Sequence, residues 1–180
     1  MSTPQPYEIS LYEGQNHILS LGKIKERWLM WHVTTGCNIE CRYCYGTFDG
    51  NSYKKTYSPS DDVPIGRMLD IADEIAKLGF EHVNINGGET FLRHDIWQLI
   101  DRLFGHKIKI WALTNGTFLQ DGFEENFITG KLATLAFSLD SIRPEYGNYV
   151  REKTESVLKN IKNISELKRK ENVLTKLRLM

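Results

Sequence analysis

The sequence predicts a single α/β domain built on parallel strands, preceded by a short extension. Its 180 residues fit one domain, because domains commonly span roughly 100–200 residues. From about Trp28 onward, short apolar segments alternate with helical periods, which is typical of parallel strands joined by crossover helices. Polar or glycine-rich motifs follow the predicted strands, where a parallel barrel places its active site.

The elements follow from local patterns in chain order. Residues 7–20 alternate apolar and polar side chains around a turn at 13–16, so residues 1–27 are predicted to be an extension with a β-hairpin. Strands are predicted at the apolar segments 29–34, 82–86, 107–113, 133–139 and 173–180. Helices are predicted where apolar residues recur every three to four positions, from the start signal at 60–64 to Gly79 and at 95–104, 123–128 and 149–170.

The fifth predicted strand differs between its two faces. Lys176 and Arg178 share one face, and Thr175 and Leu177 share the other. Cations on one face are expected of a strand that lines a polar barrel interior or lies at an open edge. An open edge has unpaired backbone groups, which invite pairing with another chain.

Composition and charge exclude several classes of protein. Lys and Arg total 23, equal to Asp and Glu, and this zero net charge disfavours general nucleic-acid binding. No apolar run reaches the roughly 18–20 residues of a membrane span, and the first residues do not resemble a secretion signal. We therefore expect a cytoplasmic protein, in which thiols stay reduced.

Three cysteines fall within eight residues, at Cys37, Cys41 and Cys44, and the chain has no others. An odd number excludes a closed disulfide framework and favours a metal site. A structural zinc ion requires four ligands, so a fourth would have to come from a distant residue such as His32 or His82. Three cysteines on one loop can instead hold a [4Fe–4S] cluster with one iron left open. The cluster is the favoured prediction; zinc and unrelated thiols are the alternatives.

The later polar motifs are less specific individually. The Gly-Gly-Glu motif at 87–89 permits close backbone approach and places a carboxylate near the rim, but it also fits a tight turn. The Thr-Asn-Gly motif at 114–116 contains a common turn dipeptide. Ser138 and Asp140 are two residues apart on a predicted strand, so they share a face, or they cap the next turn.

Together, these motifs resemble those of the radical S-adenosylmethionine (SAM) enzymes. The resemblance rests on the spacing Cys37-x-x-x-Cys41-x-x-Cys44 with Tyr43 before the third cysteine, followed by Gly-Gly-Glu, Thr-Asn-Gly and Ser-Leu-Asp in order. It covers about residues 28–180. The set is most similar to the branch containing the molybdenum-cofactor cyclase and the SPASM-type, peptide-modifying maturases.

The resemblance implies a fold, two cofactors and roles for individual residues. The implied fold of residues 28–180 is a partial (β/α) barrel of the radical SAM type, truncated after about the fifth strand, which a partner chain or a missing C-terminal part would complete. The resemblance further implies that Cys37, Cys41 and Cys44 hold the [4Fe–4S] cluster in this barrel and that the fourth iron binds SAM. Reductive cleavage of SAM would give a 5′-deoxyadenosyl radical that abstracts hydrogen from a substrate. The implied SAM contacts are Tyr43 near the adenine, Gly87, Gly88 and Glu89 at the amino group, Thr114, Ser138 and Asp140 at the methionine or ribose, and Arg151 at the carboxylate.

The resemblance leaves the substrate open, as a peptide or a small molecule. It implies a one-electron reductant of the flavodoxin or ferredoxin type as a partner. A second hypothesis is a non-catalytic iron–sulfur or partner-binding module derived from the same fold. The presence of Tyr43 and of the Gly-Gly-Glu motif favours the enzyme, because a module that holds only a cluster does not need residues that contact SAM.

Overall fold

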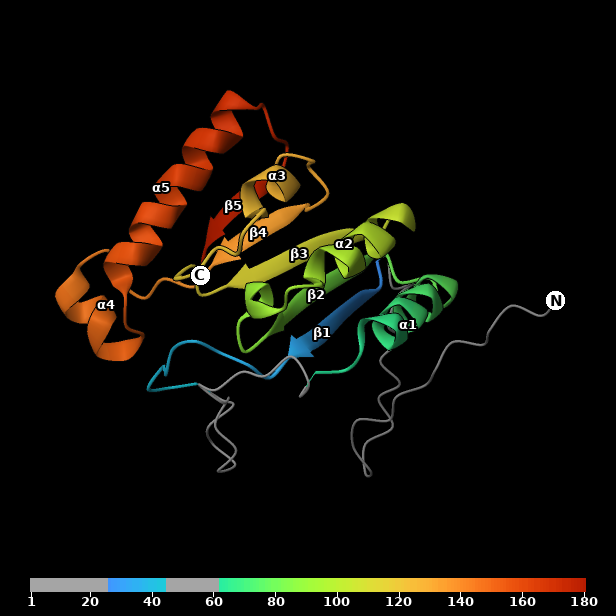
Figure 1. Cartoon of the computed structure of the whole chain (residues 1–180), viewed down its shortest axis with the longest axis horizontal. Coiled ribbons are helices and arrows are strands. Elements are labelled where there is room, and N and C mark those ends of the chain that lie inside the picture. The colour runs from blue at the N-terminus through green and yellow to red at the C-terminus, as the bar shows by residue number, and fades with distance from the viewer. Residues whose placement is uncertain (1–25, 45–61) are drawn as a thin grey trace, which may run out of the picture.

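The computed structural model describes residues 26–44 and 62–180. The predicted hairpin and the segment 45–61 lie outside these residues, and the boundary between the extension and the core stays a prediction. Strands β1 to β5 form one parallel sheet in chain order (Figure 1). The strands are β1 (Trp28–Thr34), β2 (His82–Gly87), β3 (Lys109–Thr114), β4 (Thr134–Phe137) and β5 (Lys176–Leu179). The helices are α1 (Ile65–Lys77), η3 (a 3₁₀ turn, Thr90–Leu92), α2 (Ile96–Gly105), α3 (Phe123–Phe127), α4 (Pro144–Val150) and α5 (Thr154–Lys170).

One face of the sheet packs against the helices and forms the core. Val83 pairs with Ile110 and Ile85 with Ala112 across β2 and β3, and all four side chains are completely buried. Helical residues of the same core include Met68, Leu99, Phe123 and Ile164. Alternation along each strand places the intervening residues on the opposite face. This arrangement confirms the predicted partial barrel of strand–helix units.

The opposite face of the sheet is polar and aromatic. Trp28 is 46% exposed and Met30 is 63% exposed on edge strand β1. On edge strand β5, Lys176 and Arg178 are exposed, and the Arg178 guanidinium lies 4.5 Å from the centre of the Trp111 ring. Thr175, immediately before β5, is buried. The predicted difference between the faces of this segment is therefore confirmed.

Two predictions at strand ends need correction. Strand β5 begins at Lys176, later than the predicted 173, and strand β4 ends at Phe137. Ser138 and Asp140 therefore lie in the loop after β4 rather than on a strand. The backbone N–H of Ser138 still donates to the Thr114 carbonyl at 2.9 Å, so this loop stays fixed to the end of β3.

The prediction of one long helix over 149–170 is wrong. The chain forms α4 and α5, separated by a turn at 151–153. Glu152 and Lys153 have φ values of +73° and +52°, in the left-handed region that a continuous right-handed helix excludes. Arg151 therefore lies in this turn and not early in a helix.

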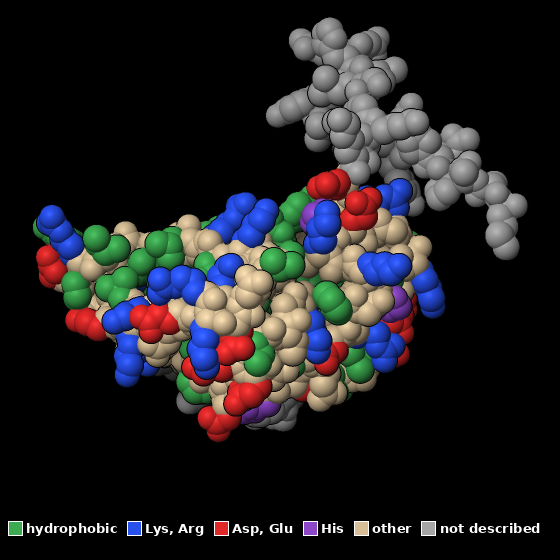
Figure 2. Space-filling model, turned by 90° about the horizontal axis from the view of Figure 1, so that it is seen from above, with side chains coloured by type: hydrophobic (Ala, Val, Ile, Leu, Met, Phe, Trp, Pro, Cys, Tyr) green, Lys and Arg blue, Asp and Glu red, His purple; other side chains and the backbone are tan. Residues whose placement is uncertain are grey.

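The surface of the described part carries charges of both signs. Figure 2 shows Lys and Arg side chains interspersed with Asp and Glu over one face. Exposed apolar side chains include Tyr146 and Tyr149 of α4. Among the described residues, no helix has the length and apolar character needed to cross a membrane.

The packing of the core predicts that two substitutions in α2 have different effects on the free energy of unfolding. Leu99 is completely buried, whereas Phe104 is 48% exposed. Leu99→Ala should lower the free energy of unfolding by about 2–5 kcal/mol, because it removes apolar contacts and leaves a cavity. Phe104→Ala should cost less than about 1 kcal/mol. Urea unfolding of both variants measures the difference, and equal losses would place Leu99 outside the core.

Candidate functional site

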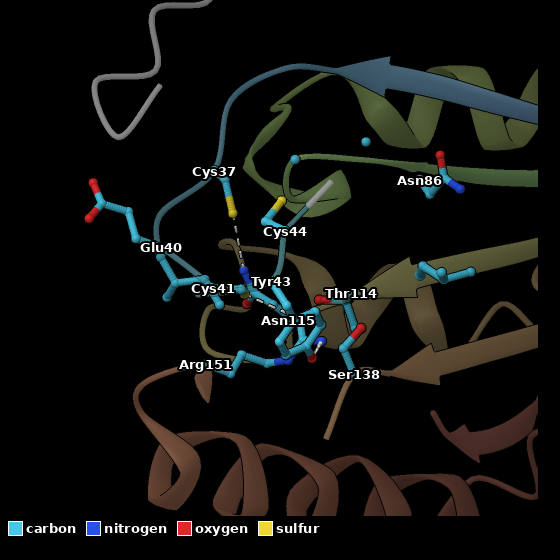
Figure 3. Close-up of a pocket in the computed structure, with 14 residues that line it drawn as sticks. Cys37, Glu40, Cys41, Tyr43, Cys44, Asn86, Thr114, Asn115, Ser138 and Arg151 are labelled. Atoms are coloured by element: carbon cyan, nitrogen blue, oxygen red, sulfur yellow. Dashed lines mark hydrogen bonds between the residues drawn. The ribbon is translucent and has the colours of Figure 1, made fainter. Parts of the chain in front are cut away.

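The loops that follow the strands surround one pocket, as the sequence predicts for the carboxyl ends of parallel strands (Figure 3). Its lining includes most of the predicted site residues: Cys37, Cys41, Tyr43, Cys44, Gly87, Gly88, Thr114, Ser138 and Arg151. Glu89 and Asp140 contact lining residues from outside the pocket surface. Sequence reasoning did not assign Ile39, Glu40, Asn86, Leu113 or Asn115, which also line it.

The Gly-Gly-Glu segment holds the start of the cysteine loop through backbone contacts. The N–H of Gly88 donates to the Thr34 carbonyl at 3.0 Å, and the N–H of Glu89 donates to the Gly36 carbonyl at 2.7 Å. A Cβ atom on Gly88 would lie 2.0 Å from the Gly36 carbonyl oxygen, and Gly87 has a φ of +143°. Glycine is therefore required so that two segments of backbone can touch.

Glu89 joins this segment to the loop after β3. Its carboxylate accepts hydrogen bonds from the Thr114 hydroxyl at 2.7 Å, the Asn115 N–H at 2.6 Å and the Phe91 N–H at 3.1 Å. The side chain is completely buried, and burial raises its pKa to about 7 although the three hydrogen bonds act in the opposite direction. In the structure Glu89 fixes loop geometry; its contact with the SAM amino group stays a prediction.

Asn115 connects the loop after β3 to the cysteine loop. Its Nδ2 donates to Asn38 Oδ1 at 2.8 Å and lies 3.8 Å from Cys37 Sγ, and its Oδ1 accepts from the Thr117 N–H at 2.9 Å. The signal in the sequence was the central residue of the Thr-Asn-Gly motif, which also fits a simple turn. The amide thus serves both as a turn former and as a donor toward a cysteine.

Tyr43, Asp140 and Arg151 form a hydrogen-bonded group at the other side of the pocket. Arg151 Nε lies 2.8 Å from Asp140 Oδ2, the Tyr43 hydroxyl donates to Asp140 Oδ1, and Arg151 Nη2 donates to the Tyr43 oxygen. Arg151 Nη1 lies 3.4 Å from Cys41 Sγ. Burial, followed by the bond to Asp140, raises the pKa of Tyr43 to about 12. Burial opposes ionisation of Asp140, but the bonds from Tyr43 and Arg151 hold its pKa below the ordinary value.

The three cysteines all belong to the loop after β1 and line the pocket, and they form no disulfide bond. Burial raises the pKa of Cys37 and raises that of Cys41 to about 11, although the charge of Arg151 opposes the rise at Cys41. In an unliganded loop these thiols favour the protonated form. Ligation would remove their protons, because a metal binds the thiolate.

A separate group of possible metal ligands lies away from the cysteines. Among residues 26–44 and 62–180, three ligand atoms that gather within 4.8 Å belong to Glu26, Glu81 and His82, near the amino ends of β1 and β2. The pocket offers a different donor set, three thiols on one loop, which suits a [4Fe–4S] cluster with one open iron.

The comparison with protein families identifies the family to which this chain belongs. The model of the radical SAM superfamily matches residues 31–180. The chain belongs to the radical SAM superfamily. The resemblance drawn from the cysteine and glycine motifs is thereby confirmed, and a [4Fe–4S] cluster and SAM are the cofactors characteristic of this superfamily.

Several radical SAM proteins are similar to this chain. The S-adenosylmethionine-dependent nucleotide dehydratase of Lacinutrix mariniflava is 32% identical over 138 residues, which cover 76% of this chain and 27% of that protein. The mycofactocin maturase MftC of Mycolicibacterium smegmatis is 28% identical over 125 residues, 69% of this chain and 30% of the maturase. Streptococcus suis SuiB bound to its precursor peptide SuiA superposes with a TM-score of 0.71 at 19% identity, over 86% of this chain and 32% of SuiB. The chain thus matches less than half the length of these proteins.

The close contact between Gly88 and Gly36 predicts that a single methyl group added at position 88 lowers the stability of the protein. Gly88→Ala would drive Cβ into a backbone carbonyl, so we expect a loss of about 1–3 kcal/mol in the free energy of unfolding and a displaced cysteine loop. The control is Gly66→Ala in α1, where a Cβ meets no atom within 4 Å. That variant should gain up to about 1 kcal/mol from helix propensity. Urea unfolding compares them, and a stable Gly88→Ala protein would contradict the contact.

The raised pKa of Glu89 predicts that the free energy of unfolding falls as the pH rises. Its pKa is about 7 in the folded chain against an ordinary value of 4.5, so the unfolded chain ionises first as pH rises. This residue should therefore lower the free energy of unfolding by about 3 kcal/mol between pH 4 and pH 8. Glu89→Gln has no proton to lose, so this part of the dependence should vanish. Urea unfolding of both proteins across that range tests it, and identical pH profiles would refute it.

Proposed function

We propose that this chain is the cofactor-binding core of a radical SAM enzyme. With electrons from a one-electron reductant of the flavodoxin or ferredoxin type, it would cleave SAM to methionine and a 5′-deoxyadenosyl radical, which takes a hydrogen atom from the substrate. The observation that carries the proposal is that Cys37, Cys41 and Cys44 share one pocket with the Gly-Gly-Glu, Thr-Asn-Gly and Ser-Leu-Asp loops. Membership of the superfamily supports the same chemistry.

The residues present fit both cofactors. The thiolates of the three cysteines, which line one pocket, would ligate the cluster and leave one iron for SAM. The backbone at Gly87 and Gly88 borders the pocket where the methionine part of SAM would bind, with Thr114 and Ser138 beside it. The ring of Tyr43 is a candidate contact for the adenine.

The chain's own residues shape the pocket. The cysteine loop lines one part of it, and the group of Tyr43, Asp140 and Arg151 borders another. Protection of a reactive radical from side reactions would require that water be excluded from this pocket. No acid or base from the protein is required to break the C–S bond, so we assign no catalytic side chain beyond the ligands.

The substrate is proposed only as a class. The relatives include a nucleotide dehydratase and a peptide maturase by name, which supports an enzyme that acts on a small molecule or a peptide. Because the match covers less than half of each relative, parts that select their substrates can lie outside the matched region. Completion of the barrel by a partner chain or by further sequence stays a prediction.

Anaerobic reconstitution with iron and sulfide tests the proposal. The wild-type chain should bind about four irons, turn brown and bleach in air. With SAM and dithionite it should produce 5′-deoxyadenosine. Stoichiometric zinc without iron–sulfur absorbance would refute the cluster, and a cluster without cleavage of SAM would support the non-catalytic module instead.

A variant that lacks one predicted cluster ligand provides the comparison with the wild-type chain. Cys41→Ala should lose the four-iron cluster, because only two thiolates would remain on the loop. Circular dichroism and urea unfolding of the cluster-free proteins should match, since Cys41 is only partly buried. A four-iron cluster of normal content in this variant would remove Cys41 from the ligand set.

A further inference from the structure

Arg151 contacts one predicted cluster ligand directly, and its position is set by several other groups. Nη1 of Arg151 lies 3.4 Å from Cys41 Sγ, while Nε is bound to Asp140 and Nη2 to Tyr43. The guanidinium therefore uses separate donors for the thiol and for its two anchors. A planar group with fixed donors holds its orientation better than a flexible ammonium does.

The backbone around Arg151 is also fixed from both sides. Two successive residues after it, Glu152 and Lys153, adopt left-handed conformations that are costly without glycine. On the other side, the N–H of Arg42 donates to the Val150 carbonyl at 3.0 Å, which ties the cysteine loop to the end of α4. The Thr154 N–H donates to Asn148 Oδ1 at 2.7 Å and closes the turn. This backbone conformation presents the Arg151 side chain to the cysteine loop.

We propose that Arg151 is a positioning residue that orients the Cys41 sulfur and raises the reduction potential of the cluster that this sulfur ligates. The inference rests on the proposed function. It concerns the cluster itself and is separate from the predicted contact between Arg151 and the carboxylate of SAM.

The charge of Arg151 and its hydrogen bonding to the sulfur both raise the reduction potential of the cluster. Reduction adds an electron to a cluster already surrounded by thiolates, so a nearby cation stabilises the reduced form more than the oxidised form. Donation to a ligating sulfur acts in the same direction. Asp140 opposes Arg151, but Nη1 of Arg151 contacts Cys41 Sγ directly, whereas Asp140 is bound to the guanidinium through Nε. The net effect of the pair is therefore that of a cation.

Arg42 provides a matched control. It is the residue next to Cys41 and carries the same charge, but its guanidinium lies 4.1 Å above the Tyr149 ring instead of at a sulfur. Arg42→Gln keeps the backbone bond to Val150 and removes one positive charge. Any difference between the two arginines thus reports contact with the thiol rather than total charge.

The test is an electrochemical titration of reconstituted clusters without SAM, followed by electron paramagnetic resonance. Wild type, Arg151→Gln, Arg151→Lys and Arg42→Gln are compared, with iron content measured for each. Arg151→Gln should show about a tenfold lower ratio of reduced to oxidised cluster at a given potential, which is a shift of about 59 mV for one electron. Arg42→Gln should match wild type, and Arg151→Lys should fall between.

Each outcome distinguishes the inference from the proposed function. A wild-type chain without a cluster refutes the proposed function. A normal cluster in wild type with an unchanged potential in Arg151→Gln overturns the inference alone, and so does an equal shift in Arg42→Gln. If Arg151→Gln takes up no cluster, retention by Arg151→Lys supports the role at Cys41, whereas loss from both variants makes Arg151 a residue of the fold and overturns it.

Discussion

The buried carboxylate of Glu89 is the interaction on which the geometry of the site depends. It accepts hydrogen bonds from the loop after β3 and from η3, while its own N–H binds the start of the cysteine loop at Gly36. Glu89 therefore joins two segments that are distant in sequence, the end of β3 and the start of the cysteine loop, and also caps η3, which follows it directly. Burial of a carboxylate opposes folding unless it is hydrogen-bonded, and here every bond that offsets burial also fixes a part of the pocket.

The cysteine loop is held at its two ends by different kinds of contact. At its start, Gly36 meets Gly88 backbone to backbone, which permits no side chain and little movement. At its end, Arg42 is bound to Val150 and the Cys41 thiol is approached by Arg151. Asn115 contacts the middle of the loop. A short loop fixed at start, middle and end can present three sulfur atoms without secondary structure of its own.

The order of the strands and the place of the pocket could be predicted from the sequence, because apolar periodicity and polar motifs at strand ends are both local signals. The 3₁₀ turn at η3 and the break between α4 and α5 could not. The apolar stripe of α5 gives no sign that Glu152 and Lys153 leave the helix, and the contacts on either side of them, from Arg151 to Cys41 and from Thr154 to Asn148, depend on the folded chain. Likewise, the Gly-Gly-Glu motif indicated close approach to a ligand, and only the structure shows that Glu89 and Gly88 contact the chain itself.

Burial links the chemistry of the thiols to that of the groups around them. Burial raises the pKa of Cys37 and Cys41, and the guanidinium of Arg151, 3.4 Å from Cys41 Sγ, opposes the rise at Cys41. Asp140 balances part of that charge and, with Tyr43, binds the other donors of Arg151. Glu152 and Lys153 adopt costly left-handed conformations where α4 ends, and this break leaves Arg151 in the turn from which its side chain reaches the sulfur.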